Sequence, residues 1–230
     1  MIKFYYNLAP NPMKVALFLE EADLPYEPVP IDTRKGEQHS AAFLALNPNA
    51  KLPVITDGDA VVFDSNAILL YLAEKTGQFL PAGGDKMRGE LLSWLMFVAS
   101  GVGPFSGQAV HFRNFAPEKV PYALKRYDFE ARRHWRIVDD RLSQSDYMLG
   151  NEYSIVDMSV WGWASRLSYM LGDEDIMAEF QNLDRLMKEI DARPATQRAA
   201  AIAERHQFKQ EFDEAAMRSL YPQIYAPNPQ

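Results

Sequence analysis

A proline inside a strand-like run, followed at a short distance by a serine, is the pattern in this chain that points most directly to chemistry. Leu52-Pro53-Val54-Ile55 precedes Ser65, which lies eleven residues after Val54 and opens the apolar helical run 67–72. Because proline has no backbone N–H, Leu52-Pro53 predicts either the break of an edge strand or a cis peptide bond. In both cases we expect the backbone N–H and C=O groups of Val54 to be free to pair with a ligand.

Ser65 stands where the next helix begins, and it is predicted to be the N-cap residue of that helix. The exposed amides of a helix start attract a carboxylate through hydrogen bonds and through the helix dipole. A plain helix cap is the alternative interpretation, and one serine can serve both roles. Val54 and Ser65 together therefore predict a clamp for an extended peptide with an anionic end.

The composition indicates a globular protein without a membrane partner. The 230 residues are 47% hydrophobic and 12% aromatic, enough for one large domain or two small ones. No apolar stretch approaches the roughly 18 residues that cross a bilayer. The N-terminal run 1–6 is strand-like and lacks the layout of a secretory signal, so we expect a cytoplasmic protein.

Charge and cysteine content exclude further classes. The net charge is -7 and the basic residues are scattered, which disfavours a nucleic-acid partner. The chain has no cysteine, which excludes disulfides, thiolate metal sites and cysteine nucleophiles. The four histidines are dispersed, so no metal is predicted. Any sulfur chemistry must arrive with a ligand.

The first third of the chain predicts a small α/β domain with the order strand, helix, strand, helix, hairpin, helix. Asn11 as N-cap and Pro12 as the first helical residue mark the start of the first helix. The remaining elements are expected at 26–31 (strand), 41–46 (helix), 53–56 and 60–63 (hairpin strands flanking Asp57-Gly58) and 65–75 (helix). We place this domain at residues 1–80.

Residues 76–85 have the composition of a linker, and no convincing strand follows them. The sequence therefore predicts a fold of an α/β domain plus an all-α domain at residues 86–206. Its helices are expected at 86–113, 120–145, 154–171, 174–190 and 194–206, with prolines and glycines near the breaks. The tail 207–230, with three late prolines, is predicted to be irregular and to lie on the surface.

This combination of elements resembles the soluble, cytosolic glutathione transferases over nearly the whole chain. The resemblance implies a thioredoxin-like N-terminal domain followed by a helical C-terminal domain. Tyr153-Ser154-Ile155-Val156-Asp157-Met158 is similar to the family's buried helix start, with Ser154 as cap and Asp157 as its capping-box partner. We interpret this segment as structural.

Within the family the chain is most similar to the bacterial Nu class and the related fungal nitrogen-regulator group. Six segments in order carry this likeness: Asn11-Pro12, Lys35-Gly36-Glu37-Gln38, Asn47 to Pro53, Asp64 to Ile68, Gly103 to Gln108, and Arg126-Tyr127 leading to Arg133. One departure is Ala9, because the class often has a threonine two positions before the asparagine. A second hydroxyl donor near the sulfur is therefore missing.

Asn11 is the candidate catalytic residue. A polar donor at a helix N-terminus lowers the pKa of a thiol by favouring the thiolate, which is the nucleophile. The alternative is that Asn11 only caps its helix. Tyr5 and Tyr6 are rival thiol activators at the first strand, but we expect both to serve packing.

The resemblance implies a set of glutathione-binding residues around the clamp. Val54, with Leu52-Pro53 before it, should pair its backbone with the cysteinyl unit as an added strand does. Ser65 and the amide of Asn66 should hold the γ-glutamyl carboxylate, and Asp64 the ammonium group. Gln38 and Lys51 resemble the residues that hold the glycyl carboxylate, although an exposed lysine alone is usually only solvated.

The second domain should supply the remaining contacts. Arg133 looks like the class arginine that reaches the ligand, with Arg132 as the competing choice and a surface ion pair as the alternative for either. Four residues after a Gly-Pro break are predicted to line the electrophile pocket: Phe105, Gln108, His111 and Phe112. Aromatic residues at helical spacing are also typical of a core.

The resemblance implies an enzyme that takes glutathione as co-substrate. Its expected reactions are reduction of disulfide bonds and of organic hydroperoxides, with weak conjugation. The likeness also implies a homodimer, and an open pocket for two glutathiones or glutathione disulfide would fit this chemistry.

Two other functions stay open. One is a glutathione lyase or conventional conjugating transferase for a specific catabolic substrate, and the other is a non-catalytic glutathione-binding module. The missing cysteine rules out a dithiol glutaredoxin and a dehydroascorbate reductase.

Overall fold

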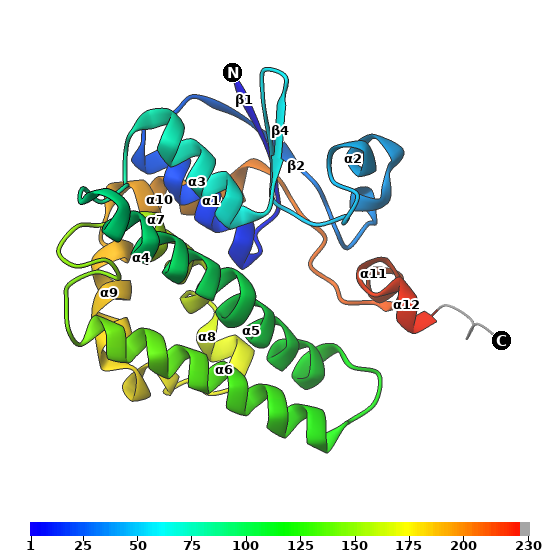
Figure 1. Cartoon of the computed structure of the whole chain (residues 1–230). Helices are drawn as coiled ribbons and strands as arrows, with labels where there is room; N and C mark the ends of the chain where they lie inside the picture. The colour runs from blue at the N-terminus through cyan, green and yellow to red at the C-terminus, as the bar shows by residue number, and fades with distance from the viewer. Residues whose placement is uncertain (226–230) are drawn as a thin grey trace.

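The computed structural model describes residues 1–225. Its first part is a four-stranded sheet with helices on both sides, drawn blue to cyan in Figure 1. The elements are β1 (Ile2–Tyr6), α1 (Pro10–Glu21), β2 (Tyr26–Pro30), a 3-10 turn (Glu37–His39), α2 (Ala41–Leu46), β3 (Val54–Asp57), β4 (Ala60–Phe63) and α3 (Ser65–Thr76). The strand order is β2-β1-β3-β4. β1 is parallel to β2, and the other pairs are antiparallel. The predicted order of elements and the thioredoxin-like domain are confirmed.

The rest of the described chain is helical, which confirms the predicted fold class. Its elements are α4 (Gly84–Phe97), a π-helical stretch (Val98–Val102), α5 (Gly103–Val110), a second π-helical stretch (His111–Phe115), α6 (Pro121–Leu142), α7 (Ile155–Ala164), α8 (Leu167–Leu171), a 3-10 turn (Ile176–Glu179), α9 (Gln181–Asp191), α10 (Pro194–Ala200) and a 3-10 turn (Ala201–Arg205). The predicted helices 86–113 and 154–171 are thus each divided, and the helix expected from residue 174 starts at Gln181. The domain limits at 80 and 86 stay a prediction.

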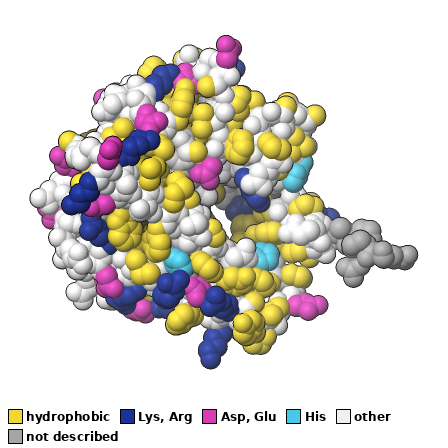
Figure 2. Space-filling view, viewed as in Figure 1, with side chains coloured by type: hydrophobic (Ala, Val, Ile, Leu, Met, Phe, Trp, Pro, Cys, Tyr) yellow, Lys and Arg dark blue, Asp and Glu magenta, His cyan; other side chains and the backbone are white. Residues whose placement is uncertain are grey.

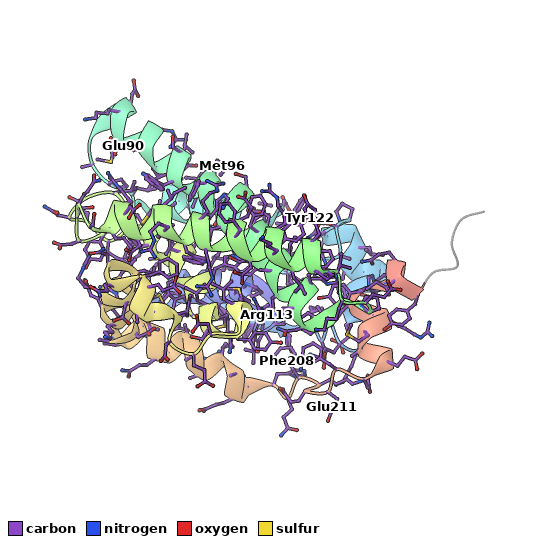
Figure 3. The ribbon with its side chains drawn as sticks, turned by 90° about the horizontal axis from the view of Figure 1, so that it is seen from below. Glu90, Met96, Arg113, Tyr122, Phe208 and Glu211 are labelled. Carbon is purple, nitrogen blue, oxygen red and sulfur yellow. The ribbon has the colours of Figure 1, made fainter. Side chains whose placement is uncertain are left out.

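The prediction of an irregular tail is wrong for part of residues 207–230. α11 (Glu214–Leu220) and α12 (Pro222–Tyr225) lie beside α2 in Figures 1 and 3, and residues 226–230 lie outside the described part. The Asp213 carboxylate caps α11 by accepting from the Ala216 N–H at 2.8 Å. Sequence patterning missed this helix because its apolar contacts are made with distant segments rather than with its neighbours.

Two predicted helix starts are displaced by one or two residues. α1 begins at Pro10 with Ala9 as N-cap, so Asn11 is its second residue. α3 has Asp64 rather than Ser65 as N-cap, because the Asp64 carboxylate accepts from the backbone N–H groups of Asn66 (2.9 Å) and Ala67 (3.2 Å). The N-cap side chain normally satisfies these donors. Both corrections move the candidate residues from the cap into the first helical turn.

The two parts of the protein share one apolar core. α1 packs against α7 and α10, and α3 packs against α7, so the helical part covers the α1 face of the sheet. The predicted capping box of α7 is confirmed, with Ser154 and Asp157 bonded reciprocally. Within residues 1–225 no helix is long and apolar enough to cross a membrane.

Candidate active site

A small polar cavity of about 220 Å³ lies where the first turns of α1 and α3 meet the helical part. Ten residues line it: Asn11, Lys14, Asp64, Ser65, Asn66, Val98, Ala99, Gly103, Pro104 and Trp163. Sequence analysis predicted four of them, Asn11, Asp64, Ser65 and Asn66, as site residues. The structure therefore brings together the residues predicted to activate the thiol and to bind the γ-glutamyl end.

The side chain of Asn11 has a defined orientation in this cavity. Its Oδ1 accepts a hydrogen bond from the indole Nε1 of Trp163 at 2.9 Å and one from the Ser65 hydroxyl at 3.3 Å. An indole N–H can only donate, so the amide oxygen must face Trp163. The two N–H donors of Asn11 Nδ2 are consequently directed away from Trp163.

Lys14 is an unpredicted member of the site. Its side chain is 1% exposed, and its Nζ donates to Ser65 Oγ at 3.4 Å. No carboxylate within residues 1–225 lies at ion-pair distance from this Nζ. Burial lowers the pKa of Lys14 to about 7, partly offset by the charge of Asp64.

The slot for Lys14 exists because α7 has a glycine there. A Cβ on Gly162 would lie 2.4 Å from Lys14 Cγ and 2.7 Å from the Pro10 carbonyl oxygen. Any larger residue at this position has to push α7 away from α1. The contact between the two helices therefore keeps the Lys14 amine in the cavity.

The first turn of α3 offers fewer free donors than predicted. The backbone N–H of Asn66 already donates to the Asp64 carboxylate. The Asn66 side chain forms hydrogen bonds with residues of the helical part. It donates to the Leu95 carbonyl at 3.3 Å and accepts from the Ser159 hydroxyl at 2.6 Å. The expectation of a free Asn66 backbone N–H is wrong. The backbone N–H of Ser65 remains as a donor, while the Ser65 hydroxyl donates to Asn11 Oδ1.

The Leu52-Pro53 peptide bond is cis, which is one of the two alternatives predicted from the sequence. Val54, however, lies inside the sheet, opposite Tyr5 of β1 and Phe63 of β4. The prediction that the Val54 backbone is free is therefore wrong. Leu52 precedes the strand, and among residues 1–225 its N–H and C=O take part in no backbone hydrogen bond. Sequence reasoning placed the free backbone two residues too late.

Gln38 is buried beneath the C-terminal segment. Its Nε2 donates to the Thr33 carbonyl at 3.2 Å and to the Ser219 carbonyl at 3.3 Å. Its Oε1 is buried without a hydrogen-bond partner in the described part of the chain. Lys51 is exposed and lines neither cavity, so its predicted contact with the glycyl carboxylate stays a prediction.

The two candidate arginines of α6 are engaged in ion pairs outside both cavities. Arg132 contacts three carboxylates, those of Asp128 (3.2 Å), Asp173 (3.3 Å) and Glu179 (2.6 Å). Arg133 pairs with Glu130 at 2.9 Å and has a half-exposed side chain. Of the two, Arg133 is the more available, and its role in binding a ligand stays a prediction.

A larger, mainly apolar cavity of about 550 Å³ opens next to the small one. Figure 2 shows a hollow at this place, bordered by hydrophobic side chains, between the end of the sheet, α5 and α11. Its lining includes Val110 and Phe115, Trp163, Arg166, Tyr169 and Met170, and the tail residues Phe208, Phe212, Leu220 and Tyr221. Trp163 is the one residue that lines both cavities in the described part of the chain.

The four residues predicted for an electrophile pocket are not part of the lining of this cavity. The rings of Phe105 and Phe112 pack near Tyr127, and that of His111 lies 4.7 Å from the Tyr221 ring. Burial lowers the pKa of His111. Gln108 is exposed. A role of these four in binding a second substrate stays a prediction.

Sequence reasoning missed three parts of the site: Lys14, Trp163 and the tail. Lys14 directly precedes the apolar helical run 15–19, and its place one turn after Asn11 was an available signal. Trp163 and Phe208 are about 150 and 200 residues from Asn11, and no local pattern relates them. In Figure 3 Phe208 and Glu211 lie on the C-terminal segment that leads to α11.

Tyr5 and Tyr6, the rival thiol activators, are both engaged elsewhere. Tyr6 is buried and stacks on Phe4, while the Tyr5 ring meets Phe43 edge to face. Neither is in the lining of the small or the large cavity. No group of three or more His, Asp or Glu residues that could hold a metal ion occurs within residues 1–225.

A thioredoxin-like sheet joined to a helical domain, with a polar cavity at the first turns of α1 and α3, defines the class of glutathione-binding transferases. Residues 2–74 match the family described as "Glutathione S-transferase, N-terminal domain", and residues 122–189 match "Glutathione S-transferase, C-terminal domain". The chain belongs to the glutathione S-transferase family.

Individual relatives narrow this assignment. The protein named disulfide-bond oxidoreductase YfcG of Escherichia coli (strain K12) is 38% identical over 211 residues, which are 89% of this chain and 96% of that protein. A glutathione transferase of Burkholderia graminis, solved with two glutathione molecules per subunit, is 33% identical with a TM-score of 0.81, covering 89% of both chains.

A glutathione transferase of Pseudomonas putida was solved with one glutathione disulfide per subunit. It is 32% identical with a TM-score of 0.82, covering 88% of this chain and 91% of that one. The predicted resemblance to the glutathione transferases is confirmed, and these relatives are consistent with a Nu-like member.

Proposed function

We propose that this protein is a Nu-like glutathione transferase whose main activity is the reduction of disulfide bonds by glutathione. The observation that carries the proposal is the fixed orientation of the Asn11 amide, with Oδ1 bonded to Trp163 and Ser65. Nδ2 then offers N–H donors to a ligand sulfur. A donor of this kind beside a helix N-terminus favours a thiolate over a thiol.

The rest of the small cavity suits the γ-glutamyl end of glutathione. The N–H and hydroxyl of Ser65 donate to its carboxylate, and this anion favours the protonated, positively charged form of the Lys14 amine behind Ser65. Asp64 accepts from its ammonium group. The free backbone of Leu52, next to the cis Pro53, pairs with the cysteinyl unit. Lys51 holds the glycyl end, because the Nε2 donors of Gln38 are already taken by the Thr33 and Ser219 carbonyls.

Disulfide reduction follows from a thiolate held in this way. The thiolate attacks one sulfur of the substrate, the S–S bond breaks, and the other sulfur leaves as a thiolate that takes up a proton. A second glutathione then attacks the mixed disulfide, releasing glutathione disulfide and the second thiol. No protein cysteine takes part, in agreement with the sequence.

The named activity of the Escherichia coli relative and the glutathione disulfide bound by the Pseudomonas putida relative support this direction. We propose reduction of organic hydroperoxides and weak conjugation as lesser activities of the same thiolate. The large apolar cavity beside Asn11 has room for a second glutathione or for an apolar second substrate.

The test is an assay of the purified protein with glutathione and bis(2-hydroxyethyl) disulfide, with cumene hydroperoxide and chlorodinitrobenzene in parallel. We expect strong disulfide reduction, and roughly a hundredfold loss of it in Asn11→Ala, the scale for removing one hydrogen-bond donor from a developing anion. Asn114→Ala, an exposed asparagine of the second π-helical stretch, is the control.

The other outcomes separate the alternatives. Strong conjugation without disulfide reduction identifies a conventional transferase. Binding of glutathione without turnover identifies a lyase for another substrate or a binding module. Unchanged turnover and affinity in Asn11→Ala contradict the role of Asn11.

We further propose that the protein acts as a cytoplasmic homodimer. Exposed apolar side chains on β4 and α4 support an interface there, since Val61, Phe63 and Met96 are each 46% exposed. Light scattering on the purified protein decides between dimer and monomer.

A further inference from the structure

The activating residue Asn11 has two ends of opposite character, so its orientation decides its effect. Its Nδ2 donates and stabilises a thiolate, whereas its Oδ1 carries negative partial charge and repels one. A half-turn of the amide exchanges the two ends with little change in shape. Whatever fixes this rotation is therefore part of the activation of the thiol.

Trp163 is the group that distinguishes the two orientations. Its Nε1–H points at Asn11 Oδ1 at 2.9 Å, and an indole has no acceptor with which to bond the flipped amide. Ser65 does not discriminate, because its hydroxyl can donate or accept. When a carboxylate binds at Ser65, its hydroxyl proton turns to that anion, and only the Trp163 bond continues to hold Oδ1.

The indole itself is held in place by glycines of α5. A Cβ on Gly103 would lie 3.1 Å from Trp163 Nε1, and a Cβ on Gly107 would lie 3.7 Å from its Cη2. The ring thus lies against the bare backbone of α5. Its position between the two cavities also puts it beside the second substrate.

We propose that Trp163, on α7 of the helical part, is a positioning residue that keeps the Asn11 amide turned with Nδ2 toward the glutathione sulfur. This inference rests on the proposed function of Asn11. It makes the helical part a participant in the activation of the thiol and not only a wall of the second-substrate cavity. The match of residues 2–74 to the N-terminal family domain does not by itself indicate this role of the helical part.

Trp163→Phe tests the proposal, because it keeps an aromatic ring and removes the N–H. The ultraviolet absorbance of the thiolate of bound glutathione is followed against pH in wild type and variant. We expect the thiol pKa to rise by about one unit and kcat for bis(2-hydroxyethyl) disulfide to fall roughly tenfold at neutral pH, with KM for glutathione nearly unchanged.

Trp161→Phe is the matched control. It removes an indole N–H from the same helix, one that donates to Asp191 at 2.8 Å and faces away from the site. We expect it to leave the thiol pKa unchanged. Gly103→Ala weakens the same hydrogen bond in a second way, because its methyl group displaces Trp163 Nε1 from Asn11. It should also raise the thiol pKa.

A double-mutant cycle with Asn11→Ala completes the test. Once Asn11 is gone, Trp163→Phe should cause no further change in the thiol pKa. If Asn11→Ala shifts the thiol pKa but Trp163→Phe and Gly103→Ala do not, the positioning role is overturned while the proposed function stands. If Asn11→Ala itself leaves the thiol pKa unchanged, both are overturned.

Discussion

The two neighbouring cavities of this protein are built on opposite principles. The small one, about 220 Å³, is polar and is enclosed by the first turns of α1 and α3, whose side chains bond to one another. The large one, about 550 Å³, is mainly apolar and is closed by a tail some 200 residues from α1. The first is suited to the polar end of one defined ligand, and the second to substrates that vary in shape.

The two cavities also differ in what holds their walls. Ser65, Asn11, Trp163 and Lys14 of the small cavity form one connected set of hydrogen bonds. The tail over the large cavity is attached mainly to the loop before α2, where Arg34 donates to the Lys209 carbonyl at 2.6 Å. In the proposed function, chemistry and substrate choice are therefore carried by separate structures that meet at Trp163.

Lys14→Met is expected to have the largest effect on stability, and the effect depends on pH. A change of pKa from 10.5 to about 7 corresponds to about 5 kcal/mol against the folded state below pH 7. Between pH 7 and 10.5 the unfolded chain binds more protons than the folded one, so wild-type stability increases as the pH rises through this range. Replacing the amine with an apolar group of similar length removes both the cost and its pH dependence.

The measurement is urea unfolding of wild type and Lys14→Met at pH 6 and pH 9. We expect the variant to gain about 5 kcal/mol at pH 6 and about 2 kcal/mol at pH 9. Lys86→Met, an exposed lysine of α4, should show no such difference. A variant with the same stability as wild type at both pH values would contradict a net cost of burying the amine.

Gly162→Ala tests the close contact between α7 and α1 beside the small cavity. The added methyl group meets Lys14 Cγ and the Pro10 carbonyl well inside contact distance, so we expect a loss of about 2–3 kcal/mol in the free energy of unfolding. Affinity for glutathione should fall as α1 shifts. Gly107→Ala, whose Cβ makes only an ordinary contact with Trp163, is the control and should be neutral or stabilising. Equal stability of the two variants would show that α7 does not define the slot.

Phe212→Ala tests whether the large cavity can be altered by itself. The Phe212 ring lies under the Arg34 guanidinium at 3.8 Å and lines this cavity. We expect KM for an aromatic disulfide to rise roughly three- to tenfold, from about 1 kcal/mol of lost contact. The thiol pKa of bound glutathione should not change. Phe129→Ala, at a side chain that is 60% exposed, is the control, and a shifted thiol pKa would show that the cavities are coupled.

The contrast between the cavities also explains what could be predicted from the sequence. Asn11, Asp64 and Ser65 lie in helix starts, where residue type and spacing carry local signals, and the order of elements up to α3 was predicted correctly. The exact helix starts were not predicted correctly. Pro10 and Pro12 are both suitable as the first residue of α1, Asp64 and Ser65 are both suitable as the N-cap of α3, and only the path of the backbone decides between them. The free backbone was assigned to Val54 because the sequence does not show that β3 has a neighbour on each side.

The parts that the sequence could not reveal depend on contacts between distant segments. In the sequence, Trp163 cannot be told from the other apolar residues of α7. Its hydrogen bond to Asn11 forms only when α1 and α7 pack together. The tail has the composition of an irregular surface segment, yet Ser219 bonds to the Thr33 carbonyl at 2.7 Å. No periodic pattern encodes such contacts.

A crystal structure of the protein with glutathione bound tests the central claim most directly. The account predicts that the sulfur lies within about 3.5 Å of Asn11 Nδ2, with the γ-glutamyl carboxylate on the N–H and hydroxyl of Ser65. A sulfur bonded to Tyr5, or a glutathione seated entirely in the large cavity with Asn11 turned away, would contradict it.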